Sequence, residues 1–332
     1  MSNIFLAKAP YRVSLLGGGS DLDWFVNQNG YGYSLGYSLD LSSTISLHPL
    51  PDTASRGILN YSTREYYSSN SQVIHPLIRS AFGRFQNLPF FELSSYGVAS
   101  GGSGLGGSSS FLVALLGVLS LYTEQPFSPF EIAAQASNIE INDLSLPIGR
   151  QDQFTSALGG FSCLKFLPGG VVEQLRLSEH HLKALYRLVD TLILIPTKIT
   201  RPADKVLSQL RGDPMSVSQF SEIRSLAEIF ITNQSNNPTL LLQTLHELIS
   251  ESWKIKRKMS GVMTNDLDKF YQLISNSLPN NWVRLIGAGR GGYFLVSLKI
   301  SREAAFRILN ELKIFDSFPA AISEEGLVTN VF

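Results

Sequence analysis

The chain has 332 residues, with 27 basic and 27 acidic side chains, one cysteine and 44% hydrophobic residues. At roughly 150 residues per domain, this length predicts about two domains, each with its own core. Zero net charge argues against a generally basic nucleic-acid-binding protein, and a lone cysteine excludes a disulfide framework or a multi-thiolate zinc site. The longest apolar run, Phe111 to Leu119, is far shorter than the ~20 residues that cross a bilayer, and the N-terminus lacks a signal-peptide core. We therefore expect a soluble, cytoplasmic protein without nucleic-acid or membrane partners.

The first half of the chain mixes predicted strands and helices. Residues 11–16 and 42–48 are short, rich in β-forming residues and bounded by turn residues, which predicts two strands. An apolar segment opened by small residues predicts a helix over 107–122, and a capping box with proline at the first helical position, Ser128-Pro129-Phe130-Glu131, starts another. Residues 161–176 predict a hairpin that turns on a proline and two glycines.

The second half begins with the apolar strand pattern of residues 191–196. The helices predicted after it span about 203–211, 216–232, 238–259, 265–277 and 302–312, and the strands span 283–287 and 293–298. A final extended stretch ends at Phe332. A polar segment near 180–190 suggests a domain boundary. We therefore predict an α+β protein with domains of residues 1–185 and 186–332.

Glycine gathers in three places where the periodic patterns break: residues 17–19, 101–107 and 287–292. Glycine permits positive φ and close approach of a ligand to the main chain, although a turn explains any one cluster equally well. The middle cluster opens directly into the predicted helix 107–122 and carries several serines. Free N–H groups and the positive end of the helix dipole at such a place can hold a triphosphate.

This segment differs from two familiar phosphate-binding motifs. The P-loop fails because no lysine lies between residues 100 and 110. Gly102-x-Gly104-x-x-Gly107 matches the dinucleotide fingerprint, which also needs an acidic residue about 20 positions later on a second strand. The later acids, Glu124 and Glu131, lie in a loop and at a helix start. A nicotinamide-dependent oxidoreductase is therefore a less favoured alternative.

Two acidic residues follow the glycine segment. Glu140 lies near the end of the capped helix, where a negative charge opposes the helix dipole, and Asp152 lies in the polar segment 149–153. Each alone is more often a solvated carboxylate. Beside a phosphate site, one can hold Mg²⁺ and the other can orient or deprotonate an attacking hydroxyl.

Three motifs together, in order and spacing, resemble the GHMP kinases (galactokinase, homoserine, mevalonate and phosphomevalonate kinases). They lie at residues 9–21, 102–109 and 287–292. Within that family the chain is most similar to the D-glycero-D-manno-heptose 7-phosphate kinase branch, whose other similar strings fall at 139–140, 149–154, 199–201 and 253–257. The resemblance spans almost the whole chain, and the ordered set is far more specific than any single glycine motif.

The resemblance implies a ribosomal S5 domain 2-like N-terminal domain that binds ATP and a ferredoxin-like C-terminal domain, with ATP and a sugar or sugar phosphate between them. It implies that Ser108 and Glu140 ligate Mg²⁺, that Asp152 is the catalytic base or a positioning group, and that Arg12 lowers the pKa of the attacked hydroxyl. The implied nucleotide-binding residues are Gly101, Gly102, Ser103, Gly104, Leu105, Gly106, Gly107, Ser108 and Ser109. The implied substrate-binding residues are Gly18, Gly19, Ser20, Asp21, Gln151, Arg201, Gly289 and Arg290.

The chain departs from the family pattern at three places. Ala99-Ser100 stand where the family usually has two prolines, Gly107 replaces the first of two serines, and Arg290 replaces a glycine. Because Ser108 keeps the inferred metal position, we expect catalysis to survive. The basic run 254–258 predicts a solvated helix face, with contact to a phosphorylated substrate as the alternative.

We therefore predict an ATP- and Mg²⁺-dependent kinase that phosphorylates the anomeric hydroxyl of a heptose 7-phosphate or a similar sugar and feeds nucleotide-sugar synthesis. The altered glycine loop favours a different possibility, a catalytically idle protein of the same fold with a binding or regulatory role. The sequence does not determine the oligomeric state.

Overall fold

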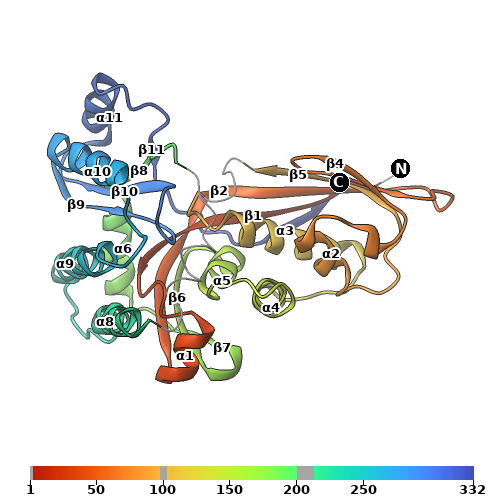
Figure 1. The fold of residues 1–332 in the computed structure, drawn as a ribbon, viewed down its shortest axis with the longest axis horizontal. Coiled ribbons are helices and arrows are strands. Elements are labelled where there is room, and N and C mark those ends of the chain that lie inside the picture. Colours follow the sequence, from red (N-terminus) through yellow and green to blue (C-terminus); the bar gives the residue numbers. More distant parts are fainter. Residues whose placement is uncertain (1–2, 98–102, 200–212) are drawn as a thin grey trace.

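The computed structural model describes residues 3–97, 103–199 and 213–332. A large sheet with helices packed on it extends along the longest axis, and a smaller sheet with its own helices lies at one end (Figure 1). The predicted α+β class is confirmed. No helix within these ranges is long and apolar enough to cross a membrane.

The larger sheet is built on the long antiparallel pair β1 (Phe5–Leu16) and β2 (Gly32–Pro49). Its order is β12-β1-β2-β5-β3-β4, and β6 pairs with the first part of β2 and with β7. The other strands are β3 (Gly57–Asn60), β4 (Arg64–Tyr67), β5 (Phe91–Gly97), β6 (Phe161–Leu167), β7 (Val171–Gln174) and β12 (Val328–Val331). The predicted strands at 11–16 and 42–48 and the hairpin at 161–176 are confirmed, and β1 and β2 extend beyond the predicted limits.

Helix α3 (Gly107–Tyr122) packs on both long strands, and its limits agree with the prediction. Every residue from Leu112 to Ser120 is buried, as expected for a helix segment that is apolar on every side. The capping box is confirmed, because Ser128 Oγ accepts the N–H of Glu131 at 3.3 Å and the Glu131 carboxylate accepts the N–H of Ser128 at 2.8 Å. The other helices and helical turns here are α1 (Asp23–Asn29), η1 (Asn70–Gln72), α2 (Pro76–Phe82), α4 (Pro129–Asn138), η2 (Ile139–Asp143), α5 (Gln151–Leu158) and η3 (Pro168–Gly170).

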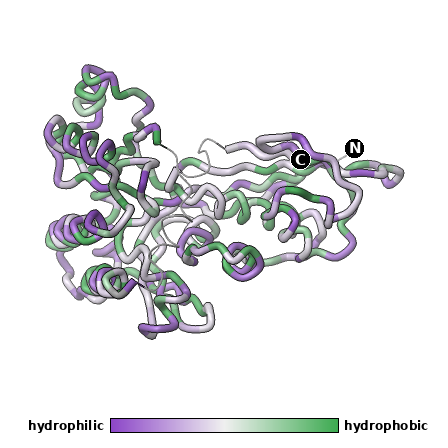
Figure 2. Tube along the Cα trace, viewed as in Figure 1, coloured by the Kyte–Doolittle hydropathy of each residue, from purple (hydrophilic) through white to green (hydrophobic). Residues whose placement is uncertain are grey.

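The smaller sheet is antiparallel, with the order β11-β8-β10-β9. Its strands are β8 (Leu192–Pro196), β9 (Asn280–Leu285), β10 (Tyr293–Leu298) and β11 (Phe318–Pro319). The helices of this part are α6 (Glu179–Val189), α8 (Pro214–Ile231), α9 (Pro238–Arg257), α10 (Asn265–Ser277) and α11 (Arg302–Glu311). Hydrophilic and hydrophobic residues alternate around α8 and α9, as is typical of helices that cover a core (Figure 2). These elements confirm the predicted ones, except the helix at 203–211, which lies outside the described residues.

The predicted boundary between residues 185 and 186 falls inside α6. Ser178 caps this helix, because its Oγ accepts a hydrogen bond from the N–H of His181 at 3.3 Å. Leu185 and Leu188 are buried. The segment with the polar start is therefore an amphipathic helix. After β11 the chain returns to the larger sheet, where β12 pairs with the beginning of β1. The division into 1–185 and 186–332 stays a prediction, and the last strand of the second part belongs to the sheet of the first.

Three clusters of buried apolar residues form the core. One lies between the larger sheet and its helices, and another lies between the smaller sheet and its helices. The remaining cluster joins the two sheets, since it contains Val13 and Leu35 of the larger sheet together with Leu194 and Leu295 of the smaller one. Burial of apolar surface therefore holds the two parts together where the candidate site lies.

Candidate active site

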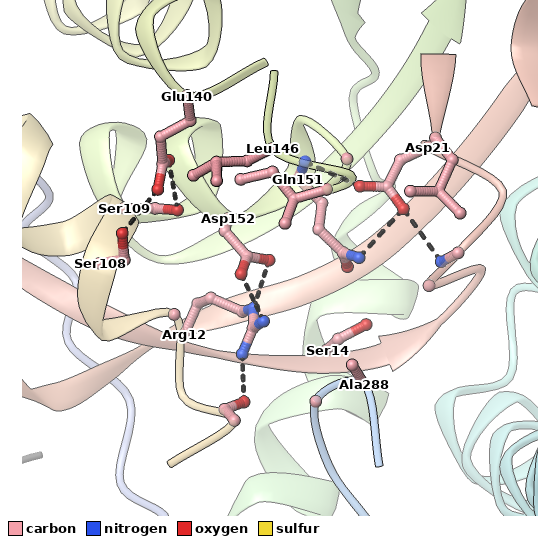
Figure 3. Close-up of a pocket in the computed structure, with 18 of the residues that line it drawn as sticks. Arg12, Ser14, Asp21, Ser108, Ser109, Glu140, Leu146, Gln151, Asp152 and Ala288 are labelled. Atoms are coloured by element: carbon pink, nitrogen blue, oxygen red, sulfur yellow. Dashed lines mark hydrogen bonds and ion pairs between the residues drawn. The ribbon is translucent and has the colours of Figure 1, made fainter. Parts of the chain in front are cut away.

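A cavity of about 290 Å³ opens where the two sheets meet. Its wall comes from β1 and the loop after it, the loop before α3, the segment from η2 to α5, helices α8 and α9, and the turn after β9. Each of the three glycine clusters contributes residues to this wall. Figure 3 shows the polar side chains that converge there.

The loop before α3 presents its main chain to the cavity. Gly104 and Gly106 have positive φ, +77° and +74°, and Gly106 directly precedes the helix. The Leu105 side chain is buried in the core, but its carbonyl accepts the N–H of Arg12 at 3.0 Å, which fixes the loop to β1. Residues 106–109 line the cavity, so the N–H groups of the first helical turn, which have no partner among the described residues, lie at its wall and can donate hydrogen bonds to an anion.

Glu140 is buried in the π-helical turn η2 and accepts three hydrogen bonds. Ser108 Oγ donates to Oε1 at 2.7 Å, and Ser109 Oγ donates to Oε2 at 2.8 Å. Gln153 Nε2 donates to Oε2 at 2.5 Å. Burial raises the pKa of Glu140 in spite of these donors, because desolvation opposes the charged form.

Ser108 and Glu140 fit a magnesium site. Ser108 is exposed, whereas Ser109 is buried. Ser108 Oγ lies 2.7 Å from Glu140 Oε1, and neighbouring ligands of an octahedral Mg²⁺ ion are about 3 Å apart. Within the described ranges no group of three or more His, Cys, Asp or Glu residues could hold a metal. An ion here would therefore take its other ligands from phosphates and water, as Mg²⁺ usually does.

Arg12 and Asp152 form a two-pronged ion pair on the cavity wall (Figure 3). The guanidinium Nε donates to Oδ1 at 2.6 Å and Nη2 donates to Oδ2 at 2.5 Å, while Nη1 donates to the carbonyl of Gly104 at 2.6 Å. Asp152 lies in the first turn of α5, a helix that the sequence analysis missed because its start is polar and glycine-led. Arg12 therefore fixes Asp152 relative to the loop before α3.

Asp21 lies across the cavity from Glu140 (Figure 3). It is buried and accepts the N–H of Gly19 at 2.9 Å, and the N–H and Nε2 of Gln151, both at 3.1 Å. Gly149 is required for this contact, because a Cβ there would lie 1.9 Å from Asp21 Oδ2. Burial raises the pKa of Asp21, with a smaller effect of the same sign from Asp152.

Several predicted binding residues do not line the cavity. Ser20 Oγ donates to two main-chain carbonyls, at 2.8 and 2.9 Å, and so holds the turn after β1. Gly289 and Arg290 also lie outside the cavity wall, and Arg290 Nε donates to the carbonyl of Gly261 at 2.9 Å. The predicted residues that fall outside the described ranges are Gly101, Gly102 and Arg201, together with the altered loop positions Ala99 and Ser100.

The structure adds lining residues that the sequence analysis missed. Ser14 and Phe220 line the cavity, as do Leu22, Leu146, Ile148, Met259 and Val262. Ser14 follows Arg12 by two positions on β1, and alternate residues of a strand share a face, so the pattern could have indicated it. The apolar residues carried no such signal, because nothing local separates them from core residues.

Contrary to the prediction from the sequence, the basic run 254–258 is not solvated throughout, because Lys256 lines the cavity. The outer lysines of the run are exposed, whereas Lys256 turns into the cavity, where its Nζ donates to the carbonyl of Gly287 at 2.6 Å. Burial, with smaller effects from Arg284 and Arg12, lowers the pKa of Lys256 to about 7. The available signal was spacing, since Lys256 lies three positions after the buried Trp253 on the same helix face.

The dinucleotide-binding alternative is wrong. In the described chain α3 is followed by α4, η2 and α5 before the next strand, β6. That strand pairs antiparallel with β2, so the glycine segment does not belong to a parallel βαβ unit.

Comparison with known proteins points to one family. Residues 73–160 match the family model of the GHMP kinases N terminal domain. A D-glycero-alpha-D-manno-heptose 7-phosphate kinase of Campylobacter jejuni is 27% identical, over 97% of this chain and 94% of its own length.

Solved structures share the fold over nearly the whole chain. A D-glycero-D-manno-heptose 1-phosphate kinase from Bacteroides thetaiotaomicron has a TM-score of 0.75 at 21% identity, covering 98% of both chains. A galactokinase from Lactococcus lactis complexed with galactose has a TM-score of 0.73 at 14% identity, covering 98% of this chain and 95% of that one. These matches confirm the predicted resemblance and fold.

Proposed function

We propose that this chain, a phosphotransferase with the GHMP kinase fold, transfers a phosphoryl group from ATP to the anomeric hydroxyl of a heptose 7-phosphate or a similar sugar. The name of the Campylobacter relative supports this substrate class, because the similarity covers almost both whole chains. The product would be a sugar 1-phosphate suited to nucleotidylation, which supports a cytoplasmic role ahead of nucleotide-sugar synthesis.

One observation carries the proposal: three carboxylates with different partners surround one cavity (Figure 3). Glu140 lies with Ser108 beside the start of α3, and Asp21 lies across the cavity. Asp152 lies between them. A triphosphate at the helix start and a sugar at Asp21 would therefore meet beside Asp152.

In the proposed mechanism, main-chain N–H groups at the start of α3 bind the triphosphate. Ser108 and Glu140 would hold Mg²⁺, which neutralises phosphate charge when bound. Asp152 accepts the hydrogen bond of the attacking hydroxyl, orients it and takes its proton, while the Arg12 charge favours the developing alkoxide. Phosphoryl transfer needs position and charge neutralisation more than covalent chemistry, and these groups supply both.

The remaining polar groups suit the sugar. Asp21, Gln151 and the main chain of Gly18 and Gly19 line one side of the cavity and would bind its hydroxyls. We further propose that residues 1–185 supply the nucleotide site and residues 186–332 the opposite wall.

The test measures ADP release with ATP and Mg²⁺ across free and phosphorylated hexoses and heptoses, and NMR locates the new phosphate. We expect the highest kcat/KM with a heptose 7-phosphate and a product carrying phosphate on the anomeric oxygen. ADP release at the background rate with every sugar would favour the catalytically idle alternative. Transfer to another hydroxyl would refute the proposed position of reaction.

Asp152→Asn tests the role of the central carboxylate. The amide keeps the shape but cannot take a proton, so turnover should fall by about 10²- to 10⁴-fold. Binding of ATP, measured by calorimetry, should persist. Asp266→Asn is the matched control, because Asp266 is an exposed residue of α10 away from the cavity. Near-normal turnover of Asp152→Asn would reject the assigned role.

A further inference from the structure

Lys256, which lines the cavity, lies within electrostatic reach of the buried Arg284, and within the described ranges neither cation has a carboxylate partner. Lys256 Nζ donates one hydrogen bond, to the carbonyl of Gly287 at 2.6 Å. Arg284 of β9 is only 4% exposed and donates from Nη1 to the carbonyl of Leu15, and its Nε has no hydrogen-bond partner in the part of the chain that the structure describes. Among the described residues, neither cation takes part in an ion pair. Burying unpaired charge is costly, so this pair indicates a place for an anion.

The neighbouring acids do not fill that role. Asp152 already accepts two hydrogen bonds from Arg12. Asp21 is within electrostatic reach of Lys256, but its oxygens accept from Gly19 and Gln151. With respect to the described residues, the Lys256 ammonium donates one of its three N–H groups, and the other two are available to a ligand in the cavity that it lines.

The charges that act on Lys256 and on Glu140 overlap only at Asp152. Lys256 interacts electrostatically with Asp21 and Asp152. Glu140 interacts with the serines of α3 and also with Asp152. The charge of Lys256 therefore acts on Asp21, beside which the sugar is proposed to bind.

The turn that Lys256 holds offers further donors. Gly287 and Ala288 line the cavity, and in the described structure neither main-chain N–H donates a hydrogen bond. Gly287 has φ of +75°. Successive free N–H groups around a residue of positive φ are a common feature of phosphate sites.

We propose that Lys256, supported by the charge of Arg284 and the N–H groups of residues 287–288, binds the phosphate that the acceptor sugar already carries. This assignment rests on the proposed function and deepens it, because it gives the enzyme a reason to prefer a phosphorylated sugar. A phosphate monoester dianion matches two unpaired cations and accepts several hydrogen bonds at once.

The test compares Lys256→Gln with the matched control Lys254→Gln, which removes the same charge from an exposed position of α9. The measured quantity is the ratio of kcat/KM for heptose 7-phosphate to kcat/KM for the free heptose. Loss of a charged contact to phosphate should lower this ratio on the order of 10- to 100-fold in Lys256→Gln. The ratio should not change in Lys254→Gln.

Lys256→Arg distinguishes the effect of the positive charge on phosphate binding from the effect of the hydrogen bond that holds the turn at residues 287–288. It keeps the cation, so it should retain most of the preference. An equal loss of preference in Lys256→Arg and Lys256→Gln would mean that Lys256 only positions residues 287–288, which overturns the assignment. Equal losses for the phosphorylated and free sugars would place the anion on the nucleotide and overturn it as well.

Binding of inorganic phosphate, followed by ³¹P NMR line broadening, tests the site without turnover. Wild type should bind phosphate more tightly than Lys256→Gln, and equal binding would overturn the assignment. Absence of ADP release from wild type with every sugar would refute the proposed function instead, whereas normal transfer with an unchanged ratio in Lys256→Gln would refute only the role of Lys256.

Discussion

At Glu140, the charged carboxylate that the proposed magnesium site needs lowers the stability of the folded chain. Its side chain is buried, and burial raises its pKa. Beside it, Gln153 Oε1 has no hydrogen-bond partner in the described structure. A charged carboxylate in this place is costly to the folded chain unless a cation shares the cavity.

We expect Glu140→Gln to be more stable than wild type at neutral pH. Because the folded chain raises the pKa of Glu140 above its ordinary value of 4.5, the protonated form stabilises the fold below pH 4.5, and this contribution disappears as pH rises through the raised pKa. A glutamine avoids the charge, and its amide can donate to Gln153 Oε1.

Thermal unfolding measures this difference. The Tm of Glu140→Gln should exceed that of wild type at pH 7.5, by roughly 2–4 °C for each kcal/mol of relieved desolvation. The gap should close below pH 4.5, while ATP with Mg²⁺ should raise the Tm of wild type more than that of the variant. A lower Tm of the variant at pH 7.5 would contradict this explanation.

Ser108→Ala tests the magnesium assignment. Removing the exposed hydroxyl removes one proposed ligand, so the Mg²⁺ concentration for half-maximal turnover should rise by about 10-fold or more. Ser110→Ala is the control, because Ser110 lies in the same turn but donates to the carbonyl of Ala9 at 2.7 Å. An unchanged Mg²⁺ requirement in Ser108→Ala would remove Ser108 from the site.

At the scale of elements, the loop before α3 and the turn after β9 touch through glycines. A Cβ at Gly287 would lie 2.5 Å from Gly104 Cα, and a Cβ at Gly104 would lie 2.9 Å from the carbonyl oxygen of Ile286. Both contacts are with main chain, so no side-chain rotation can relieve them. The proposed nucleotide-binding loop and the turn proposed to bind the acceptor phosphate therefore approach each other this closely only because neither glycine has a side chain.

Gly287→Ala should separate these two segments. We expect kcat/KM for ATP to fall on the order of 10- to 100-fold, because displacement of a binding loop by about 1 Å disturbs the alignment of reacting groups. Gly169→Ala is a matched control, since its φ of +77° is close to the +75° of Gly287 and its Cβ would meet nothing within 4 Å.

The left-handed backbone should cost both variants about 1–2 kcal/mol of unfolding free energy, and chemical denaturation should show a larger loss for Gly287→Ala because of its contact with Gly104. Only Gly287→Ala should lose catalytic efficiency. Equal kinetics in the two variants would show that the glycine contact does not position the site.

At the scale of the whole molecule, β12 from the second half of the chain forms the edge strand of the larger sheet. Strand β12 pairs with β1 over four residue pairs, from Phe5 with Val331 to Lys8 with Val328. Because β1 carries Arg12 further along, the C-terminus supports the strand on which the candidate site is built. A fragment of residues 1–185 would expose this edge of β1, and unpaired edges favour aggregation.

Deletion of residues 328–332 should lower the unfolding free energy by roughly 2–4 kcal/mol, since each lost hydrogen bond costs about 0.5–1.5 kcal/mol. Urea unfolding measures the loss. Phe332→Ala is the control, because this side chain is 73% exposed and its main chain keeps both hydrogen bonds to Ile4. A deletion as stable as the control would show that β12 does not contribute to the fold.

Local features were predicted from the sequence, and they proved accurate where neighbours in the chain decide the structure. The limits of α3 follow from one apolar segment, and the capping box at Ser128 depends on residues three apart. Helices α1, α5 and α6 were missed, because polar or glycine-rich starts conceal short amphipathic segments that tertiary burial stabilises.

The residues with the chemistry for phosphate, metal and proton transfer can be identified from the sequence, because those properties belong to side chains and short motifs. Which of them lie together depends on folding: Arg12 contacts Asp152 from 140 positions away, and Lys256 is the one residue of its basic run that lines the cavity. Ser20 and Arg290 are held outside the cavity by the same packing. Contacts between distant segments depend on how the two sheets bury their apolar faces against each other, and no local pattern records that arrangement.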